Sequence, residues 1–386
     1  MREVCVVVHS RANYGRIKTV MRAIQDHPDL NLQLVVGSSA LLHRFGKVID
    51  IMREDGFEPV SVVHSILEGE TPTTMAKSTG LAIVELSTHF ENLKPDVVLT
   101  VADRFETLAT AVAASYMNIP LAHTQGGEIT GSIDESVRHA ISKLAHVHFP
   151  ATERAAEFLE RMGEQKHSIY LTGCPAIDIV AETDHALPPD MFQRNRGSGA
   201  ELSQDKPYII VLQHPVTTEY GSSFAQINET LEAVHPLALE GMQVVWLWPN
   251  VDAGSDDVSR GIRMFRERND MPNMHFYKNF DPEEYVQLLA NAKCIVGNSS
   301  SGLREGAYLG TPCVNIGTRQ HGRERAANVR DVGYDADEIR QAVRDQIAHG
   351  PYEKSTLVGD GHAGKRIADA LATHEFQIQK TISYID

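Results

Sequence analysis

The fold of this chain is decided by residues 96–123, which read DVVLTVADRFETLATAVAASYMNIPLAH. The first apolar run predicts a strand that is buried on both faces and ends at Asp103 and Arg104. A helical pattern follows over residues 105–117, and a second apolar run ending at His123 predicts the next parallel strand. In open α/β sheets ligands bind beyond the carboxyl ends of strands, so both polar ends are expected to face one crevice.

The following segment, residues 124–148, is rich in acid, base and hydrogen-bonding groups beside apolar runs. Such a density of polar chemistry next to buried segments is typical of an active-site wall. Its histidines are ambiguous, because a histidine at the end of a strand or helix is more often a structural hydrogen-bonding group than a catalytic one. With His123, the polar residues are Gln125, Glu128, Asp134, Glu135, Arg138, His139, His146 and His148.

The composition predicts a globular protein with two domains. The chain has 386 residues, of which 42% are hydrophobic, and a domain typically has about 150 residues. Its net charge of −15 argues against a nucleic-acid or membrane-surface partner, because such partners require a basic face. With no signal peptide and no apolar run near the ~20 residues that span a bilayer, a cytoplasmic location is expected. The cysteines, far apart in sequence, are expected to be reduced core residues: Cys5, Cys174, Cys294 and Cys313.

Strand and helix patterns alternate along the first half of the chain. Apolar runs predict further strands at residues 3–9, 32–38, 59–64 and 169–173. Helical patterns cover residues 17–24, 40–56, 71–95 and 153–163. This alternation predicts a doubly wound parallel sheet with right-handed crossovers.

The turn after the first strand carries basic side chains. Arg11, Arg16 and Lys18 stand at the start of the first helix, where free backbone N–H groups and the helix dipole favour an anion. A solvated basic turn is the plainer interpretation. The position directly after the first strand favours a phosphate or substrate contact.

A second series of strands follows a linker at residues 182–206, which has prolines and glycines and few aliphatic residues. These strands are predicted at residues 208–214, 243–250, 274–279, 293–298 and 312–317. Each ends in polar residues, so the ligand is expected between two Rossmann-like domains, residues 1–180 and residues 181–364. The terminal region, residues 365–386, is expected to form an amphipathic helix that returns to the N-terminal domain.

The motif GNSSSG, at residues 297–302, follows one of these strands. Its Asn298, Ser299 and Ser300 precede an expected helix, so hydroxyl and N–H groups converge where a pyrophosphate would bind. A serine-rich helix N-cap is the plainer alternative. Phosphate binding is favoured by the charged residues close by in sequence, which are Arg304, Glu305, Arg319 and Arg323.

Eight motifs are spread over nearly the whole chain: SRANYGRIK, ADRFETLA, GGEITGSIDESVRHAISKLAHVH, GCPAID, LQHPVTTE, PNVDAGS, GNSSSGLRE and GTRQHGRE. As a set they resemble the hydrolysing UDP-N-acetylglucosamine 2-epimerases. The resemblance implies a glycosyltransferase-B fold in which the second domain binds the nucleotide. It also implies that UDP-N-acetylglucosamine and water become N-acetylmannosamine and UDP, as in sialic acid biosynthesis. No metal or other cofactor is implied.

The resemblance also implies roles for individual residues. Asp103 and Asp134 match catalytic carboxylates, His214 matches a histidine that contacts the phosphates, and Gln125 stands at the position of a catalytic glutamate. Nucleotide or substrate contacts are implied for Arg11, Arg104, Glu128, Asn250, Phe280, Ser299, Ser300, Glu305 and Arg319. This division suits the chemistry, because the departing diphosphate needs cations and hydroxyls while the C2 proton of the sugar needs a base. A homodimer or homotetramer is implied as well.

Two departures from the family pattern lie on the sugar side. Val101 and Ala102 stand where family members usually have histidine and glycine, and Gln125 replaces a common glutamate. A glutamine cannot take a proton, so Gln125 is expected to lie at the cleft and contact the sugar rather than supply the base. These departures leave UDP-N,N'-diacetylbacillosamine, a substrate in legionaminic acid biosynthesis, as a close alternative. A transferase of the same fold, a non-hydrolysing 2-epimerase and a non-catalytic nucleotide-sugar sensor are further alternatives.

Overall fold

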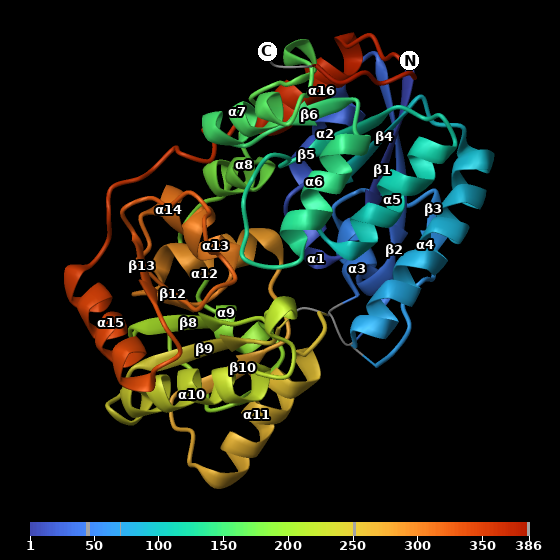
Figure 1. The fold of residues 1–386 in the computed structure, drawn as a ribbon. Helices are drawn as coiled ribbons and strands as arrows, with labels where there is room; N and C mark the ends of the chain where they lie inside the picture. Colours follow the sequence, from blue (N-terminus) through green and yellow to red (C-terminus); the bar gives the residue numbers. More distant parts are fainter. Residues whose placement is uncertain (44–46, 70, 250–251, 384–386) are drawn as a thin grey trace.

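Two α/β sheets, one in each half of the chain, form the framework of the protein (Figure 1). The computed structural model describes residues 1–43, 47–69, 71–249 and 252–383. Over these residues it confirms the prediction of two Rossmann-like domains. The four cysteines are free and buried, as predicted. In the described part of the chain, no helix combines the length and apolar character needed to cross a membrane.

In the N-terminal domain, the described strands pair in parallel in the order β3-β2-β1-β4-β5-β6. β1 is central because its run of apolar residues is buried on both faces. The strand order reverses between β1 and β4, so the chain leaves their carboxyl ends in opposite directions and opens a crevice there. The bounds are Arg2–Val8 (β1), Leu30–Gly37 (β2), Ser61–Val63 (β3), Val97–Val101 (β4), Leu121–Thr124 (β5) and Val147–Phe149 (β6).

The helices of this domain cover both faces of the sheet (Figure 1). They are α1 (Arg11–Tyr14), α2 (Lys18–Asp26), α3 (Val48–Glu54), α4 (Pro72–Leu93), α5 (Phe105–Tyr116), α6 (Asp134–Leu144), α7 (Glu153–Arg161) and α8 (Pro175–Glu182). The sequence sets the limits of the long helix α4. Thr71 and Thr74 cap its start reciprocally, and Lys94 adopts a left-handed conformation that ends it before Pro95.

The C-terminal domain repeats this plan with the strand order β13-β12-β11-β8-β9-β10-β7, in which only β7 is antiparallel among the described strands. The reversal here lies between β8 and β11, and their carboxyl ends face the crevice of the first sheet. The strands are β7 (Gly197–Gly199), β8 (Tyr208–Leu212), β9 (Gln243–Leu247), β10 (Met274–Tyr277), β11 (Ile295–Gly297), β12 (Cys313–Ile316) and β13 (Val329–Val332). The helices are α9 (Met191–Arg194), α10 (Ser223–Leu239), α11 (Ser255–Arg268), α12 (Pro282–Asn291), α13 (Ser300–Leu303), α14 (Glu305–Leu309) and α15 (Ala336–His349).

The last helix, α16 (Ala363–Thr373), lies against the N-terminal domain, although the chain reaches it from the C-terminal domain (Figure 1). Its Ile367 and Leu371 are part of the hydrophobic core around β1 and α2. The carboxylate of Asp178 in α8 caps its first turn by accepting hydrogen bonds from the N–H groups of Ala363 (2.9 Å) and Gly364 (2.6 Å).

Several of the predicted helices and strands differ in part from those of the structure. Residues 169–173 form no strand, because Ile169 makes only an isolated bridge to His148. The helix predicted at residues 40–56 is a 3-10 turn (Ser38–Leu41) followed by α3, and residues 44–46 lie outside the described part. The terminal helix ends at Thr373, and residues 384–386 are likewise outside the description. The strands β6, β7 and β13 were not predicted.

Candidate active site

A cleft of about 170 Å³ lies between the two domains, at the facing carboxyl ends of the two sheets. Its N-terminal wall includes Arg11, Arg16, Asp103, Arg104 and Asp134, and its C-terminal wall includes His214, Phe280, Tyr285, Ser299, Ser300, Glu305 and Arg319. The structure therefore brings together most of the residues predicted from sequence motifs more than 200 positions apart. Asn250, the remaining predicted contact from the second domain, lies outside the described residues.

Asp103 follows β4 and is held by an ion pair. Its carboxylate pairs with the guanidinium of Arg138, a fully buried residue of α6. A second hydrogen bond of Arg138 goes to the carbonyl oxygen of Glu128 (2.7 Å). An adjacent cation favours the ionised form of a carboxylic acid. The ion pair therefore holds Asp103 as an oriented carboxylate at the cleft.

Asp134 is the first residue of α6, one helical turn before Arg138. Burial raises its pKa, while the guanidinium groups of Arg319 and Arg104 act against that rise. The hydroxyl of Ser132 donates a hydrogen bond to its Oδ2 atom (3.0 Å). A carboxyl group with a raised pKa exchanges protons more readily near neutral pH than an ordinary aspartate. The two carboxylates of the cleft thus differ in their electrostatic environment.

Arginines of the N-terminal domain reach across the cleft. The side chain of Arg11 donates hydrogen bonds to the carbonyl of Lys278 (3.0 Å) and to Asn279 Oδ1 (2.7 Å). Arg16 donates one to Ser300 Oγ (2.7 Å). Arg104 pairs with Asp252 of the C-terminal domain (2.9 Å) as well as with its neighbour Glu106 (3.2 Å). These contacts place positive charge beside the hydroxyl groups of the opposite wall, where a diphosphate is expected.

The C-terminal wall is organised around Asn298, which is fully buried after β11. Its side chain accepts a hydrogen bond from the backbone N–H of His214 (2.7 Å) and donates one to the backbone carbonyl of His214 (2.8 Å). Its own carbonyl accepts from Arg319 (3.2 Å). The loops after β8, β11 and β12 are therefore locked together, and Ser299 and Ser300 stand between them.

Titratable groups on this wall are shifted by burial. Burial, and then the nearby guanidinium of Arg319, lower the pKa of His214 well below its usual value, so its imidazole is neutral at physiological pH. Burial also raises the pKa of Glu305. A neutral imidazole and hydroxyl groups can bind an anion through hydrogen bonds without adding a positive charge to this wall.

The sequence matches a known protein family along most of its length. The model of that family, described as UDP-N-acetylglucosamine 2-epimerase, matches residues 22–372. The chain belongs to the UDP-N-acetylglucosamine 2-epimerase family. One relative, the UDP-N,N'-diacetylbacillosamine 2-epimerase (hydrolyzing) of Legionella pneumophila, is 33% identical over 97% of this chain and 96% of its own length. The UDP-N-acetylglucosamine 2-epimerase of Neisseria meningitidis is 28% identical over 94% of this chain and 92% of its own length.

The fold agrees with that of solved UDP-N-acetylglucosamine 2-epimerases. The Neisseria meningitidis enzyme bound to UDP-GlcNAc superposes with a TM-score of 0.78 at 20% identity, over 96% of this chain and 100% of that one. The Methanocaldococcus jannaschii enzyme in complex with UDP-GlcNAc and UDP also gives a TM-score of 0.78, at 16% identity and the same coverage. The predicted glycosyltransferase-B architecture is thus confirmed for this member of the epimerase family.

Gln125 does not lie where the sequence suggested. In this epimerase family member its side chain is buried behind Arg16 and outside the cleft lining. Its Oε1 atom accepts a hydrogen bond from Arg16 (3.3 Å), and its Nε2 atom donates one to Cys174 Sγ (3.0 Å). Gln125 therefore supports the arginine that reaches Ser300, and the expectation that its amide faces the cleft is corrected. Its two side-chain hydrogen bonds, to Arg16 and Cys174, hold it in this buried position.

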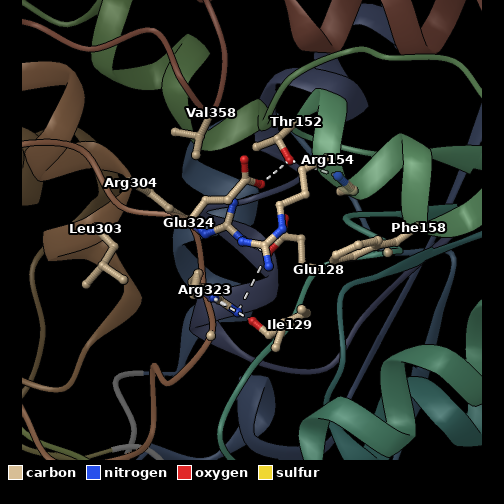
Figure 2. A pocket seen from close by; sticks show the side chains of 13 residues that line it. Glu128, Ile129, Thr152, Arg154, Phe158, Leu303, Arg304, Arg323, Glu324 and Val358 are labelled. Carbon is tan, nitrogen blue, oxygen red and sulfur yellow. Dashed lines mark hydrogen bonds and ion pairs between the residues drawn. The ribbon is translucent and has the colours of Figure 1, made fainter.

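Other predicted residues also lie outside the cleft lining. Glu128 is in a second pocket, where it pairs with Arg304 (Figure 2). Lys18 pairs with Asp55 (2.8 Å) and Glu283 (2.6 Å). The four histidines make contacts within the N-terminal domain and its returning terminal segment. His123 contacts Ala102, and His139 contacts Glu135. His146 contacts Ile378, and His148 contacts Glu164.

Two site residues had no role predicted from the sequence. Arg138 orients Asp103, and Tyr285 lines the cleft and hydrogen-bonds with Ser301 (2.6 Å). The spacing of Arg138, four residues after Asp134 on one helix, was a usable signal, because positions i and i+4 share a helix face. Tyr285 lies inside an amphipathic helix, α12, and no local sequence signal separates it from a core residue.

Proposed function

We propose that this protein is a hydrolysing 2-epimerase, which converts a UDP-linked 2-acetamido sugar and water into UDP and the free sugar inverted at C2. The observation that carries the proposal is the cleft, where two carboxylates in different environments face hydroxyl and guanidinium groups across the domain boundary. An elimination that releases a diphosphate requires both kinds of group.

In the proposed first step the C2 proton leaves, the C1–O bond breaks and its electron pair departs with UDP, giving a glycal. Asp134 is the proposed proton acceptor, because the burial that raises its pKa also makes its carboxylate a stronger base. Asp103, held by its ion pair with Arg138, is the proposed group that stabilises the positive charge developing at the anomeric carbon. Hydration then adds the oxygen of water to C1 and a proton to the opposite face of C2.

The departing diphosphate is assigned to the C-terminal wall and the arginines that reach it. Arg16 and Ser300 already contact one another (2.7 Å), and Arg11 and Arg319 lie on the same cleft. Guanidinium groups bind phosphate oxygens with charge-assisted, often paired hydrogen bonds. In a cleft from which water is excluded, such contacts strengthen as negative charge builds up on the leaving group.

Two substrates are candidates. UDP-N-acetylglucosamine, giving N-acetylmannosamine for sialic acid biosynthesis, is the first and agrees with the family as a whole. UDP-N,N'-diacetylbacillosamine, a precursor for legionaminic acid, is the second. The second is favoured by the Legionella pneumophila relative at 33% identity and by a Campylobacter jejuni relative of the same substrate class at 30%.

The test offers each nucleotide sugar separately in deuterated water and follows products by NMR. The proposal predicts free UDP and a free sugar that is inverted at C2 and carries deuterium there, because the C2 proton is replaced from solvent. The sugar with the higher kcat/KM is the substrate.

Other outcomes correspond to the alternatives. A UDP-linked epimer would identify a non-hydrolysing enzyme. Release of sugar without deuterium at C2, or transfer only to an added acceptor, would indicate a hydrolase or transferase. Binding of UDP without turnover of either nucleotide sugar would indicate a sensor.

The same proposal includes a homo-oligomer, either a dimer or a tetramer. Leu81 and Val84 on α4 and Tyr116 at the end of α5 are exposed apolar side chains, with Tyr116 88% exposed. Neighbouring helices that expose such side chains commonly form contacts between copies with closed symmetry. Sedimentation at micromolar concentration tests this, and a monomer there would contradict it.

A further inference from the structure

A second pocket lies between the domains and is separate from the cleft (Figure 2). Its walls come from the segment after β5 and the start of α7 on one side, and from α13 and the loop after β12 on the other. The charged side chains that line it are Glu128, Arg154, Arg304, Arg323 and Glu324. Its volume is about 20 Å³.

Two buried guanidinium groups share a single carboxylate in this pocket. Arg304, 2% exposed, forms an ion pair with Glu128 Oε2, and Arg323, 8% exposed, lies 3.6 Å from the same oxygen. The other described contact of Arg323 is a long hydrogen bond to the carbonyl of Ile129 (3.5 Å). Arg323 thus has no carboxylate of its own among the described residues.

Hydrogen-bond donors are left over as a result. Within the described part of the chain, the Nε and Nη1 atoms of Arg304 and the Nη1 atom of Arg323 have no hydrogen-bond partner, and one acceptor atom, Oε1 of Glu128, has none either. An unpartnered donor on a buried cation costs more than one on a neutral group. These donors belong to side chains that line the pocket.

The charges of the pocket do not balance. Among its buried side chains, two guanidinium groups, of Arg304 and Arg323, are opposed by one carboxylate, that of Glu128, because Arg154 is exposed and Glu324 is only half-buried. The half-buried carboxylate of Glu324 accepts a hydrogen bond from the hydroxyl of Thr152 across the domain boundary, which does not change its charge. Burial, and then the charge of Arg304, lower the pKa of Arg323 to about 9. Among the buried side chains of the pocket, the positive charges therefore exceed the negative charges by one.

We propose that this pocket binds one small monovalent anion, chloride, which bridges the two domains through Arg304 and Arg323. A cavity of about 10–15 Å³ is enough for one water-sized particle. A pocket of about 20 Å³ therefore has room for a monoatomic anion. The anion occupies the guanidinium N–H groups that Glu128 leaves free and completes the charge balance. A water molecule would fill the same space but leave the excess charge in place.

The first test is thermal unfolding of the full-length protein, without nucleotide, in sodium chloride and in sodium gluconate at equal ionic strength. Equal ionic strength removes general screening, and gluconate is too large for the pocket. The proposal predicts that replacing gluconate by chloride raises the unfolding midpoint by about 2 °C or more, in a saturable way. Equal midpoints in the two salts would overturn it in favour of water.

Variants locate the effect. Arg323→Gln should abolish the chloride dependence, and the matched control Arg330→Gln, at an exposed arginine paired with Asp345, should retain it. Chloride dependence that survives Arg323→Gln would place the site elsewhere and overturn the assignment. If Arg323→Gln does not fold, bromide is soaked into crystals of the unaltered protein to test whether an anion binds in the pocket. An anomalous peak between Arg304 and Arg323 supports the site, and a featureless pocket at high bromide contradicts it. The outcome does not depend on the enzymatic proposal.

Discussion

The two walls of the cleft hold their polar groups in different ways. On the N-terminal wall both carboxylates depend on one helix, since α6 begins with Asp134 and supplies Arg138 to Asp103. On the C-terminal wall the loops after β8, β11 and β12 converge on Asn298, and the groups they present are mainly hydroxyls, a neutral imidazole and one arginine, Arg319.

In the proposed mechanism, this difference separates proton transfer from binding of the leaving group. Carboxylates held by a helix keep a fixed separation and distinct electrostatic environments, which acid–base chemistry requires. Donors held by interlocked loops form a cradle that suits an anion. If the comparison is correct, substitutions on the two walls change different measured quantities.

The largest expected effect is on turnover. Asp134→Asn and Asp103→Asn should each lower kcat by ~100 to 10,000-fold, because each removes a group that acts on the sugar. The affinity for UDP, measured by isothermal titration calorimetry, should remain within about twofold, a change of less than ~0.5 kcal/mol. Glu157→Gln, at an exposed carboxylate of α7 that pairs with Arg161, is the control and should retain activity. Equal losses of turnover and UDP affinity would remove the distinction between the walls.

The next effect is on nucleotide affinity. Arg319→Ala should weaken UDP binding by roughly 10- to 100-fold, since a hydrogen bond to a charged group contributes about 1.5–3 kcal/mol. His321→Ala, at an exposed position of the same loop, should bind UDP normally and serves as the control. Unchanged UDP affinity in Arg319→Ala would assign the leaving group to the arginines of the other domain.

A smaller effect is expected on kcat/KM and on the preference between the two nucleotide sugars. Gln125→Glu puts a carboxylate at a position 3.3 Å from Arg16, and a new ion pair would draw Arg16 away from Ser300. A change of less than about tenfold in kcat/KM is expected, with the preference between the two nucleotide sugars altered and the pH profile unchanged. Gln125→Met, which removes the hydrogen bonds without adding charge, separates the two causes. A many-fold gain of activity on both sugars would instead show that a catalytic carboxylate is missing.

The smallest effect is on stability. Burial raises the folded-state pKa of Asp134 above its unfolded value. The protonated form is therefore favoured in the folded protein, and stability is lost as pH rises from about 3.9 through the raised folded-state pKa. Asp134→Asn removes this loss, so its unfolding midpoint should gain roughly 1–2 °C relative to the unaltered protein between about pH 4 and about pH 7. Calorimetry measures it, with Glu157→Gln, at an exposed carboxylate, expected to follow the unaltered protein.

The sequence predicted the strands that are buried on both faces of a sheet. It also predicted the residues that directly follow these strands. β8 is buried along its whole length, so its apolar run was sufficient, whereas the edge strand β13 has two exposed residues, Arg330 and Asp331, and gives no such signal. The strand predicted at residues 169–173 is wrong because Tyr170 packs against Phe149 (ring centroids 6.0 Å apart) without joining the sheet.

For the candidate site, the position of a residue directly after a strand indicated that it lies near the cleft. This position did not indicate how deeply its side chain is buried. Asp103 follows β4 and was assigned to the cleft, but Gln125, which follows β5, lies behind Arg16. Side-chain depth depends on the local path of the loop. The pairing of Glu128 with Arg304 joins residues 176 positions apart, and no local pattern specifies such a contact.

The return of α16 to the N-terminal domain has a consequence for biosynthesis. The core of that domain includes Ile367, Ala368 and Leu371, so the half of the chain that leaves the ribosome first stays incomplete until the final segment is made. The sheet and covering helices of the second half, up to α15, are fully synthesised before then. The domains therefore complete their cores in the reverse of the order in which their sheets are translated, and the apolar surface that α16 covers stays exposed until residues 363–373 are made.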